Sequence, residues 1–389
     1  MTGGGERLNS QGGRNAKGMR GVRVRGLVKR YGEVVAVDDL SMEFEKGTLT
    51  TLLGPSGCGK TTTLRCVAGL EKPDGGEISI GDSTVFSEGV NVPPEKRMVG
   101  IVFQSYAIWP HMTVFDNIAF PLKIRHRPRQ EVDAKVRKMM EMVRLTGLGD
   151  RPATMVSGGQ QQRIALARAL VFDPEVLLLD EPLSNLDASL RDVVRVEVRE
   201  IQRSLGITTI YVTHDQVEAL AMSDKLVVMS GGRMMAVGAP REIYTRPPNE
   251  FVASFVGKSN MIPGRVDSIP GLPTARTGES LVVVETGFGK VRCHLHGATD
   301  VKEGDSVLVT IKPENVLISA AGKDANTFAG RVELASYLGG FSEVLVSLGG
   351  EKVRVLRNSE QVSLGDGEEV SVVFPEHFCS LLSARPPPA

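Results

Sequence analysis

The sequence predicts an α/β domain with a largely parallel sheet and a helical insertion, followed by an all-β region of two OB-like repeats. Three observations predict this fold class. Short apolar strands alternate with amphipathic helices from Val22 to about Val237. Between about Gln104 and Arg151 the strand signals stop and helical periodicity takes over. Beyond Ile262 the composition shifts to valine, glycine and short alternating runs, which indicate β-structure.

The length of 389 residues predicts two to three domains, each able to bury its own core. We expect a flexible tail at 1–21, an α/β domain at 22–243 with a helical subdomain at about 104–170, a linker at 244–261 and a duplicated, OB-like regulatory β-domain at 262–389. The longest helix predicted in the insertion runs from Gln130 to Leu148. Its apolar residues recur at helical spacing and are Val132, Val136, Met139, Met140 and Val143.

Bulk composition excludes several classes of protein. The 46 basic and 46 acidic residues balance, which argues against wholesale binding of nucleic acid or anionic membranes. No apolar run approaches the roughly 18 residues that span a bilayer, and the N-terminus lacks the apolar region of a signal peptide. The 4 cysteines have no metal-ligand spacing and are too sparse for a disulfide framework, which fits a reducing cytoplasm.

The β-region repeats itself. Ile262-Pro-Gly-Arg-Val266 is echoed 66 residues later by Phe328-Ala-Gly-Arg-Val332. Val307-Leu-Val-Thr-Ile-Lys-Pro-Glu-Asn315 is echoed 62 residues later by Glu369-Val-Ser-Val-Val-Phe-Pro-Glu-His377. Two halves of this size predict two small barrels of the OB type, whose loops decide what they bind.

A phosphate-binding loop follows the strand predicted at Thr48–Leu53. Gly54-Pro-Ser-Gly-Cys-Gly-Lys-Thr61 matches the pattern Gly-x4-Gly-Lys-[Ser/Thr] and precedes a predicted helix. Glycines let backbone N–H groups curl around phosphate oxygens, and the helix N-terminus adds partial positive charge. Lys60 can neutralise the β- and γ-phosphates of ATP, and the Thr61 hydroxyl can ligate Mg²⁺. The candidate nucleotide-binding residues here are Gly54, Pro55, Ser56, Gly57, Cys58, Gly59, Lys60, Thr61 and Thr62.

Polar residues end three other predicted strands. The apolar run Val176–Leu179 is followed by Asp180 and Glu181. Asp180 is placed to hold Mg²⁺ through its water shell, and Glu181 can orient or deprotonate an attacking water. Gln104 and His214 each follow another apolar strand. Ligands of parallel sheets bind at the carboxyl ends of the strands, so we expect His214 to contact the γ-phosphate.

A second candidate phosphate site is Ser157-Gly-Gly-Gln160. A glycine inside a helix costs about 1 kcal/mol relative to alanine, so the pair belongs at or before a helix start. Ser157 can simply cap this helix. A serine hydroxyl and bare glycine N–H groups at a helix start can also form an anion site.

The order of these motifs resembles the ATPase subunit of an ABC transporter over about Val22 to Val237. The resemblance rests on Tyr31, Gly54–Thr61, Gln104, Ser157–Gln160, Asp180–Glu181, Ser184–Asp187 and His214. It implies a head-to-tail homodimer that sandwiches two ATP molecules, with Ser157, Gly158, Gly159 and Gln160 on the γ-phosphate held by the other subunit. It further implies that Gln104 senses Mg²⁺ and couples to the membrane subunits. Asp187 would signal across the dimer and Tyr31 would stack on adenine. One departure is Val156, where the family usually has leucine.

The C-terminal half of the sequence resembles one class of ABC transporter subunit in particular. Phe251–Asn260 and the duplicated β-region are similar to importer ATPases of the maltose-importer architecture. This implies two separate membrane-spanning permease subunits, an extracytoplasmic solute-binding protein and a peripheral location on the cytoplasmic face of the inner membrane. Pro93–Arg97, Trp109–His111 and the Ser-Asn pair after Gly257 look more like iron(III), polyamine or thiamine importers than sugar importers.

Three alternatives stay open at this point. One is a sugar importer ATPase. Another is a soluble ABC ATPase acting on DNA or ribosomes, which would usually carry coiled-coil insertions or tandem ATPase domains. The third is a β-repeat that binds nucleic acid or oxyanions, with the ATPase as its switch. Neutral charge and few aromatic residues in 262–382 argue against nucleic-acid binding.

Overall fold

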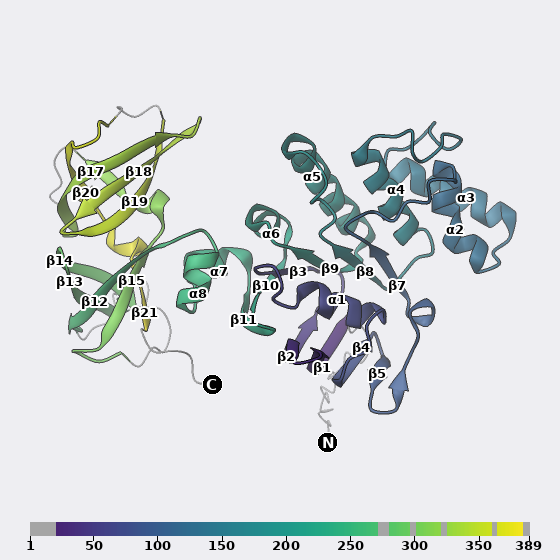
Figure 1. Ribbon diagram of the computed structural model, residues 1–389, viewed down its shortest axis with the longest axis horizontal. Coiled ribbons are helices and arrows are strands. Elements are labelled where there is room, and N and C mark those ends of the chain that lie inside the picture. Colours follow the sequence, from purple (N-terminus) through teal and green to yellow (C-terminus); the bar gives the residue numbers. More distant parts are fainter. Residues whose placement is uncertain (1–20, 271–279, 296–300, 320–324, 360–363, 384–389) are drawn as a thin grey trace, which may run out of the picture. The chain divides into compact units, whose positions relative to one another are not determined.

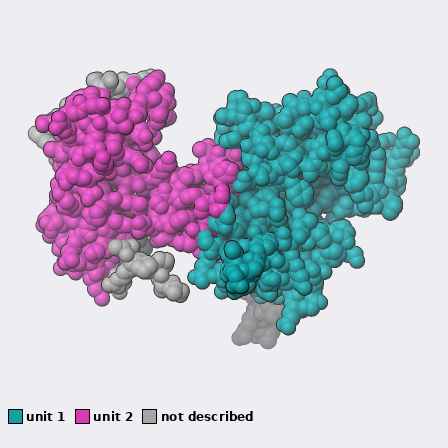
Figure 2. Space-filling view, viewed as in Figure 1, with its two compact units in different colours: residues 1–50, 57–212, 231–233 teal, residues 51–56, 213–230, 234–389 magenta. Residues whose placement is uncertain are grey.

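The computed structural model describes residues 21–270, 280–295, 301–319, 325–359 and 364–383. Residues 1–20 of the predicted flexible tail lie outside this part of the chain. The chain divides into two compact units, which are coloured differently in Figure 2. Unit 1 comprises 1–50, 57–212 and 231–233, and unit 2 comprises 51–56, 213–230 and 234–389.

The first sheet is antiparallel, with the strand order β2-β1-β4-β5-β6 (Figure 1). Only Gly32 and Glu33 separate β1 from β2, and Gly32 has a φ of 58°. A two-residue connection of this kind forces neighbouring strands to pair antiparallel. The parallel pairing predicted for the α/β domain is therefore confined to the second sheet. The strands are β1 (Val22–Tyr31), β2 (Val34–Phe44), β4 (Gly75–Ile80), β5 (Ser83–Ser87) and β6 (Val90–Asn91).

The second sheet has the strand order β11-β10-β3-β9-β8-β7. Strands β7, β8 and β9 pair parallel. Every residue of β3 and β8 is buried, as expected for strands covered on both faces. The strands are β3 (Leu49–Leu53), β7 (Val99–Val102), β8 (Val176–Asp180), β9 (Thr208–Thr213), β10 (Lys225–Ser230) and β11 (Arg233–Gly238).

Helices α1 (Lys60–Ala68) and α5 (Ala188–Leu205) belong to unit 1, and α6 (Gln216–Met222) belongs to unit 2. A single 3-10 turn, Pro94–Lys96, precedes β7. In the described part of the chain, no helix combines the length and apolarity needed to cross a membrane.

The predicted helical insertion contains α2 (Val114–Ile124), α3 (Arg129–Met142) and α4 (Gly158–Leu170), which lie together in Figure 1. All five apolar residues that predicted the long helix are buried. The helix nevertheless ends at Met142, not at Leu148. Arg144 adopts a left-handed backbone with a φ of 56°, which stops the helix, and its side chain forms ion pairs with residues of α5.

The predicted linker at 244–261 is a packed segment. It contains the end of α7 (Pro240–Thr245) and all of α8 (Glu250–Phe255). Ile243, Val252 and Val256 are buried in one apolar cluster with residues of β10. The prediction of a linker is wrong here. The run Tyr244-Thr-Arg-Pro-Pro-Asn249 joins two short helices, and the apolar residues of these helices pack in the cluster with β10.

The duplicated β-region folds as a closed barrel, β12-β13-β14-β21-β15, and a five-stranded sheet, β16-β20-β17-β18-β19. The first half of the repeat provides β12 (Asn260–Ser268), β13 (Ser280–Thr286), β14 (Gly289–Leu295), β15 (Ser306–Ile311) and β16 (Leu317–Ser319). The second half provides β17 (Thr327–Tyr337), β18 (Phe341–Leu348), β19 (Glu351–Asn358), β20 (Glu369–Val373) and β21 (Ser380–Ser383).

Each half gives its last strand to the other half. Leu317 of β16 pairs with Val373 of β20, and Leu382 of β21 pairs with Leu308 of β15. In each half a Pro-Glu turn, a 3-10 helix at Pro313–Asn315 or Glu376–Phe378, precedes the exchanged strand. One apolar core joins the two halves. Sharing it buries more apolar surface than either half could bury alone, which matters for repeats of this size.

Candidate functional site

The phosphate loop ends in a backbone that only glycine tolerates. Gly59 is the N-cap of α1 with a φ of 99°, and a Cβ there would lie 2.3 Å from the carbonyl oxygen of Ala36. The side chain of Lys60 is buried, and its Nζ donates to Cys58 Sγ at 3.7 Å. The predicted nucleotide-binding residues lie between the end of β3 and the first turn of α1. They are Gly54, Pro55, Ser56, Gly57, Cys58, Gly59, Lys60, Thr61 and Thr62.

Thr61 and Asp180 come together as predicted from their motifs. Thr61 Oγ1 donates to Asp180 Oδ1 at 2.8 Å, although 119 positions separate them in the chain. Asp180 is 5% exposed. Burial raises the pKa of Asp180, and the hydrogen bond from Thr61 opposes this only in part. A buried carboxylate of this kind gains from a nearby cation.

A cleft of about 560 Å³ contains this pair. Gln104 and Glu181 also line it, so four predicted residues share one cleft within unit 1. The hydroxyl of Thr61, the carboxylate of Asp180 and the amide of Gln104 offer oxygen ligands, which Mg²⁺ prefers. The residues present therefore fit the predicted metal.

Glu181 is held in an unusual backbone conformation. Its φ is 45°, and its N–H donates to the carbonyl oxygen of Val212 at 3.0 Å. Gln104 Nε2 donates to Glu181 Oε2 at 3.3 Å. A left-handed non-glycine residue inside a cleft is strained, and such strain concentrates at functional positions. The strained backbone and the place in the cleft mark Glu181 as a candidate functional residue.

The loop after Gln104 is tied to α4 by Arg168, which the sequence analysis missed. Arg168 donates to the carbonyl oxygens of Tyr106 at 2.6 Å and Ala107 at 2.7 Å. Its guanidinium lies 4.5 Å from the ring centroid of Trp109. Burial lowers the pKa of Arg168 to about 10, which leaves it charged at neutral pH. No motif marks this arginine, because its partners are backbone oxygens far away in the sequence.

The second predicted phosphate site is the exposed N-terminus of α4. Ser157 Oγ accepts the N–H of Gln160 at 3.4 Å, and Gln160 Oε1 accepts the N–H of Ser157 at 2.9 Å. This is a capping box. Ser157 and Gly158 are exposed, whereas Gly159 is buried where a Cβ would lie 3.1 Å from a methyl group of Leu190. The serine cap and an anion site are compatible, because the hydroxyl keeps its own hydrogen to donate.

Asp187 and Tyr31 are both accessible in the isolated chain. Asp187 is the exposed N-cap of α5 and accepts hydrogen bonds from Ser189 Oγ at 2.7 Å and Leu190 N at 2.9 Å. The bond from Ser189 lowers the pKa of Asp187. Tyr31 ends β1 with 45% of its surface exposed, and Lys29 Nζ lies 5.0 Å from its ring centroid.

His214 directly follows β9 and is exposed. The next residue, Asp215, caps α6 by accepting the N–H of Val217 at 2.7 Å and of Glu218 at 3.1 Å. Thr213 Oγ1 donates to Glu218 Oε2 at 2.7 Å. The turn that carries His214 is thus fixed by hydrogen bonds on both sides.

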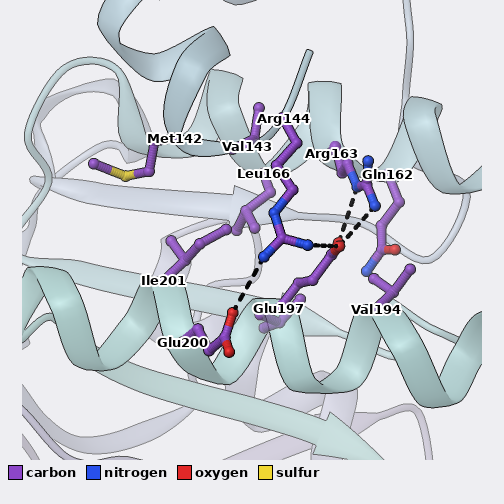
Figure 3. A pocket seen from close by; sticks show the side chains of 11 residues that line it. Met142, Val143, Arg144, Gln162, Arg163, Leu166, Val194, Glu197, Glu200 and Ile201 are labelled. Atoms are coloured by element: carbon purple, nitrogen blue, oxygen red, sulfur yellow. Dashed lines mark hydrogen bonds and ion pairs between the residues drawn. The ribbon is translucent and has the colours of Figure 1, made fainter. Parts of the chain in front are cut away.

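An ion cluster around the buried carboxylate of Glu197 connects α4 and α5 (Figure 3). Glu197 of α5 receives two hydrogen bonds from Arg163 of α4, at 2.8 and 3.0 Å. Arg144 donates to the same carboxylate at 2.9 Å. One carboxylate therefore joins the helix that begins after Ser157 to the helix that begins after Asp187.

Replacing Glu197 by glutamine is expected to destabilise unit 1 by about 2–4 kcal/mol. The substitution leaves the partly buried guanidinium of Arg163 and the more exposed guanidinium of Arg144 facing a neutral amide at a buried position of α5. Denaturant unfolding measures the loss. Glu200→Gln is the matched control, because Glu200 lies 3.6 Å from Arg144 on the surface and its loss should stay within about 0.5 kcal/mol. Equal effects of both variants would contradict a special role for Glu197.

Comparison with known proteins decides the family. The ABC transporter family matches residues 37–184, and the TOBE domain family matches residues 309–382. The trehalose/maltose import ATP-binding protein MalK of Thermococcus litoralis is 45% identical over 378 residues, covering 92% of this chain and 95% of that protein. The chain belongs to the ATP-binding subunits of ABC importers.

Other relatives of this ABC subunit extend the comparison. The Fe(3+) ions import ATP-binding protein FbpC of Rhizobium etli is 43% identical, covering 93% of this chain and 98% of that protein. The spermidine/putrescine import ATP-binding protein PotA of Rubrobacter xylanophilus is 40% identical, covering 94% of each. The solved structure of cbiO1 from Clostridium perfringens, part of the ABC transporter complex cbiONQ, has a TM-score of 0.53 and 29% identity, covering 58% of this chain and 91% of that one.

These findings confirm three predictions for the ABC subunit. Its fold class is an ABC-type ATPase domain followed by an all-β region, of which residues 309–382 match the TOBE domain family. It is an ATP-binding ATPase subunit of an import system. Import subunits of this family work with membrane permease subunits.

Proposed function

We propose that this ABC subunit hydrolyses ATP in a head-to-tail homodimer and thereby drives solute import through two permease subunits. The observation that carries the proposal is the pairing of Thr61 with buried Asp180 in the cleft that also contains Glu181. The exposed N-terminus of α4 at Ser157–Gly158 supports the dimer, because it offers a second set of anion-binding donors.

Each predicted residue has a part in this mechanism. Backbone N–H groups of Gly54–Thr62 and the amine of Lys60 hold the ATP phosphates, and Tyr31 stacks on adenine. Thr61, Gln104 and Asp180 would hold Mg²⁺, which neutralises phosphate charge when bound. Residues Ser157–Gln160 of the partner subunit bind the γ-phosphate from the opposite side.

Glu181 orients and deprotonates the attacking water. The hydrogen bond from Gln104 keeps its carboxylate in the cleft, and a positioned base of this kind contributes roughly 10²–10⁴-fold to rate. His214 steadies the γ-phosphate, and Asp187 transmits the state of one site to the other. Gln104 also reports nucleotide state to the permease, through the loop that Arg168 clamps.

We propose iron(III), a polyamine or a related small solute as the cargo, carried to the permease by an extracytoplasmic solute-binding protein. Relatives with iron(III) and polyamine names cover nearly the whole chain. A sugar is the second candidate, favoured by the 45% identity to a trehalose/maltose subunit. The subunit would sit peripherally on the cytoplasmic face of the inner membrane. The solute is tested by measuring which loaded binding protein stimulates ATP turnover of the reconstituted transporter.

The homodimer is tested by gel filtration of the Glu181→Gln protein. With ATP and Mg²⁺ the protein should shift from monomer to dimer, or an existing dimer should tighten, because bound ATP is no longer consumed. Lys60→Ala is the matched control and should show no ATP-linked shift, since it loses phosphate contacts. If the Glu181→Gln protein binds ATP but its assembly state does not change, the isolated chain does not form the proposed ATP-bound homodimer.

A further inference from the structure

A cationic turn joins α2 to α3 in unit 1, between the helices that carry these labels in Figure 1. The cationic turn is Lys123-Ile-Arg-His-Arg-Pro-Arg129, and every one of its residues is exposed. From Lys123 to Lys138 the chain has seven basic and two acidic residues, whereas the whole sequence has 46 of each. The overall neutrality of the chain therefore conceals one strongly cationic surface. None of its residues is among those predicted for the ATP site.

The backbone of the cationic turn is fixed by hydrogen bonds. The N–H of His126 donates to the carbonyl oxygen of Lys123 at 3.0 Å, and the N–H of Arg127 donates to that of Leu122 at 3.1 Å. His126 has a φ of 54°, the left-handed conformation that commonly follows the last turn of a helix. Pro128 is the N-cap of α3, so the chain passes directly into the next helix. The arginines of the turn are thus held close together in a preformed loop.

These arginines lack carboxylate partners. No hydrogen bond or ion pair joins the side chain of Arg127 or Arg129 to another described residue. Arg125 donates to the carbonyl oxygen of Pro121 at 3.2 Å, and its guanidinium lies 4.1 Å from the ring centroid of Phe172. Burial lowers the pKa of Arg125, and the nearby charge of Arg127 lowers it further. Like charges therefore repel one another in the turn, and an arriving anion would relieve this repulsion.

The acidic side chains that form ion pairs in this region bind lysines instead. Asp116 accepts from Lys123 Nζ at 2.7 Å. Lys135 Nζ lies 2.7 Å from a carboxylate oxygen of Asp173 and 3.6 Å from one of Glu131. The charge of Lys123 is thereby balanced, so the three arginines are the cations of the turn that remain for an external partner.

An exposed isoleucine stands among these cations. Ile124 is the last residue of α2, and 57% of its surface is exposed. Basic residues around an apolar side chain are typical of segments that lie on an anionic bilayer, where the cations attract headgroups and the apolar group enters the boundary below them. Single-stranded nucleic acid would instead favour exposed aromatic rings. The ring beside the turn, Phe172, is already occupied by Arg125.

We propose that the cationic turn contacts the anionic headgroups of a phospholipid bilayer, with Ile124 entering the headgroup region. The inference rests on the proposed peripheral location at the membrane, and it adds the lipid surface as a partner besides the permease. A guanidinium group can bind two phosphate oxygens at once. Each arginine near an anionic surface contributes about fivefold to binding. Three arginines would therefore orient unit 1 on the bilayer without anchoring the subunit alone.

Binding is tested by sedimentation of the full chain with vesicles of phosphatidylglycerol and phosphatidylcholine in equal parts. Vesicles of phosphatidylcholine alone, which carry no net charge, are the lipid control. The unmodified protein should bind the anionic vesicles at least about tenfold more tightly, and added salt should weaken this binding. Replacing Arg125, Arg127 and Arg129 together by glutamine should lower the affinity at least about tenfold.

A second triple variant is the matched protein control. Lys46→Gln, Lys96→Gln and Arg203→Gln together remove the same charge from exposed positions of unit 1 and should keep vesicle binding within about twofold. If the variant without the three arginines of the turn fails to fold, Arg127→Gln with Arg129→Gln decides, because no described residue bonds to either side chain. Equal losses in both triple variants, or no preference for anionic vesicles, would overturn the lipid contact.

Ile124→Ser separates a bilayer from a soluble polyanion. The substitution should weaken binding to anionic vesicles at least about threefold and leave binding to heparin unchanged, because heparin has no apolar layer for the side chain to enter. Heparin bound as tightly as the vesicles, together with no effect of Ile124→Ser, would identify a general polyanion surface and contradict the proposal.

Two further measurements separate the lipid contact from the permease and from the proposed ATPase function. If the variant without the three arginines binds bare vesicles normally but assembles poorly on vesicles that carry the permease, the partner is the permease and the lipid contact is wrong. ATP turnover of this variant should stay within about twofold of the unmodified protein. An unmodified protein without turnover would count against the proposed ATPase mechanism, whereas the vesicle result would stand.

Discussion

Glu181→Gln is expected to lower steady-state ATP turnover by roughly 10²–10⁴-fold while leaving ATP affinity nearly unchanged. Glutamine keeps the size of the side chain and can still pair with Gln104, which lies 3.3 Å from the Glu181 carboxylate. It cannot take a proton from water. Phosphate release in steady state measures turnover, and equilibrium binding of labelled ATP measures affinity.

Glu175→Gln is the matched control for this experiment. Glu175 directly precedes β8 and is exposed, whereas Glu181 directly follows it. The control should keep turnover within about twofold, since surface substitutions rarely act beyond their own contacts. Normal turnover in Glu181→Gln would remove Glu181 from the role of base and leave its strained backbone without an explanation.

Arg97→Met is expected to destabilise unit 1 by about 3–5 kcal/mol. Arg97 is 2% exposed and donates to the carbonyl oxygens of Cys66 and Val67, both at 2.8 Å, in the last turn of α1. It also donates to the carbonyl oxygens of Val92 and Val85, at 2.8 and 3.3 Å. Methionine would keep the apolar stem but remove one donor from each of these four carbonyl oxygens, of which those of Cys66 and Val85 also accept a backbone N–H.

The loss is measured as the shift in denaturant unfolding, followed by fluorescence of Trp109. The sequence has 1 tryptophan, and Trp109 belongs to unit 1, so its signal follows that unit. Lys96→Met is the control, because Lys96 is the exposed neighbour of Arg97 and should change stability by no more than about 0.5 kcal/mol. Similar shifts for both variants would show that the buried hydrogen bonds of Arg97 contribute little.

Much of the candidate site could be predicted from local sequence. The phosphate loop, the strand ending in Asp180 and the cap at Ser157 each depend on residues that are near one another in the chain. Gly59 shows why such motifs are readable: its φ of 99° and the close carbonyl of Ala36 admit no side chain. Periodicity also identified the buried side of α3, because burial of one helix face requires apolar residues at fixed spacing.

Other features depend on partners that are distant in sequence. The end of α3 at Met142 follows from the left-handed backbone of Arg144, whose side chain is engaged by Glu197. Arg168 carries no motif, since its acceptors are carbonyl oxygens about 60 positions away. The packing of α7 and α8 was also missed, because two short helices separated by prolines resemble a link.

The sequence by itself determined the chemistry of this protein: which residues can hold phosphates, which carboxylates stand beside them and how often the β-region repeats. Those properties follow from residue type and spacing. Only the tertiary structure decided that Thr61 meets Asp180, that the two β-halves exchange β16 and β21, and that Lys312 is buried beside Tyr244. These three contacts depend on how segments that are distant in sequence pack together. Burial of apolar side chains and pairing of hydrogen-bonding groups are decided over the whole chain, so a local stretch of sequence cannot reveal them.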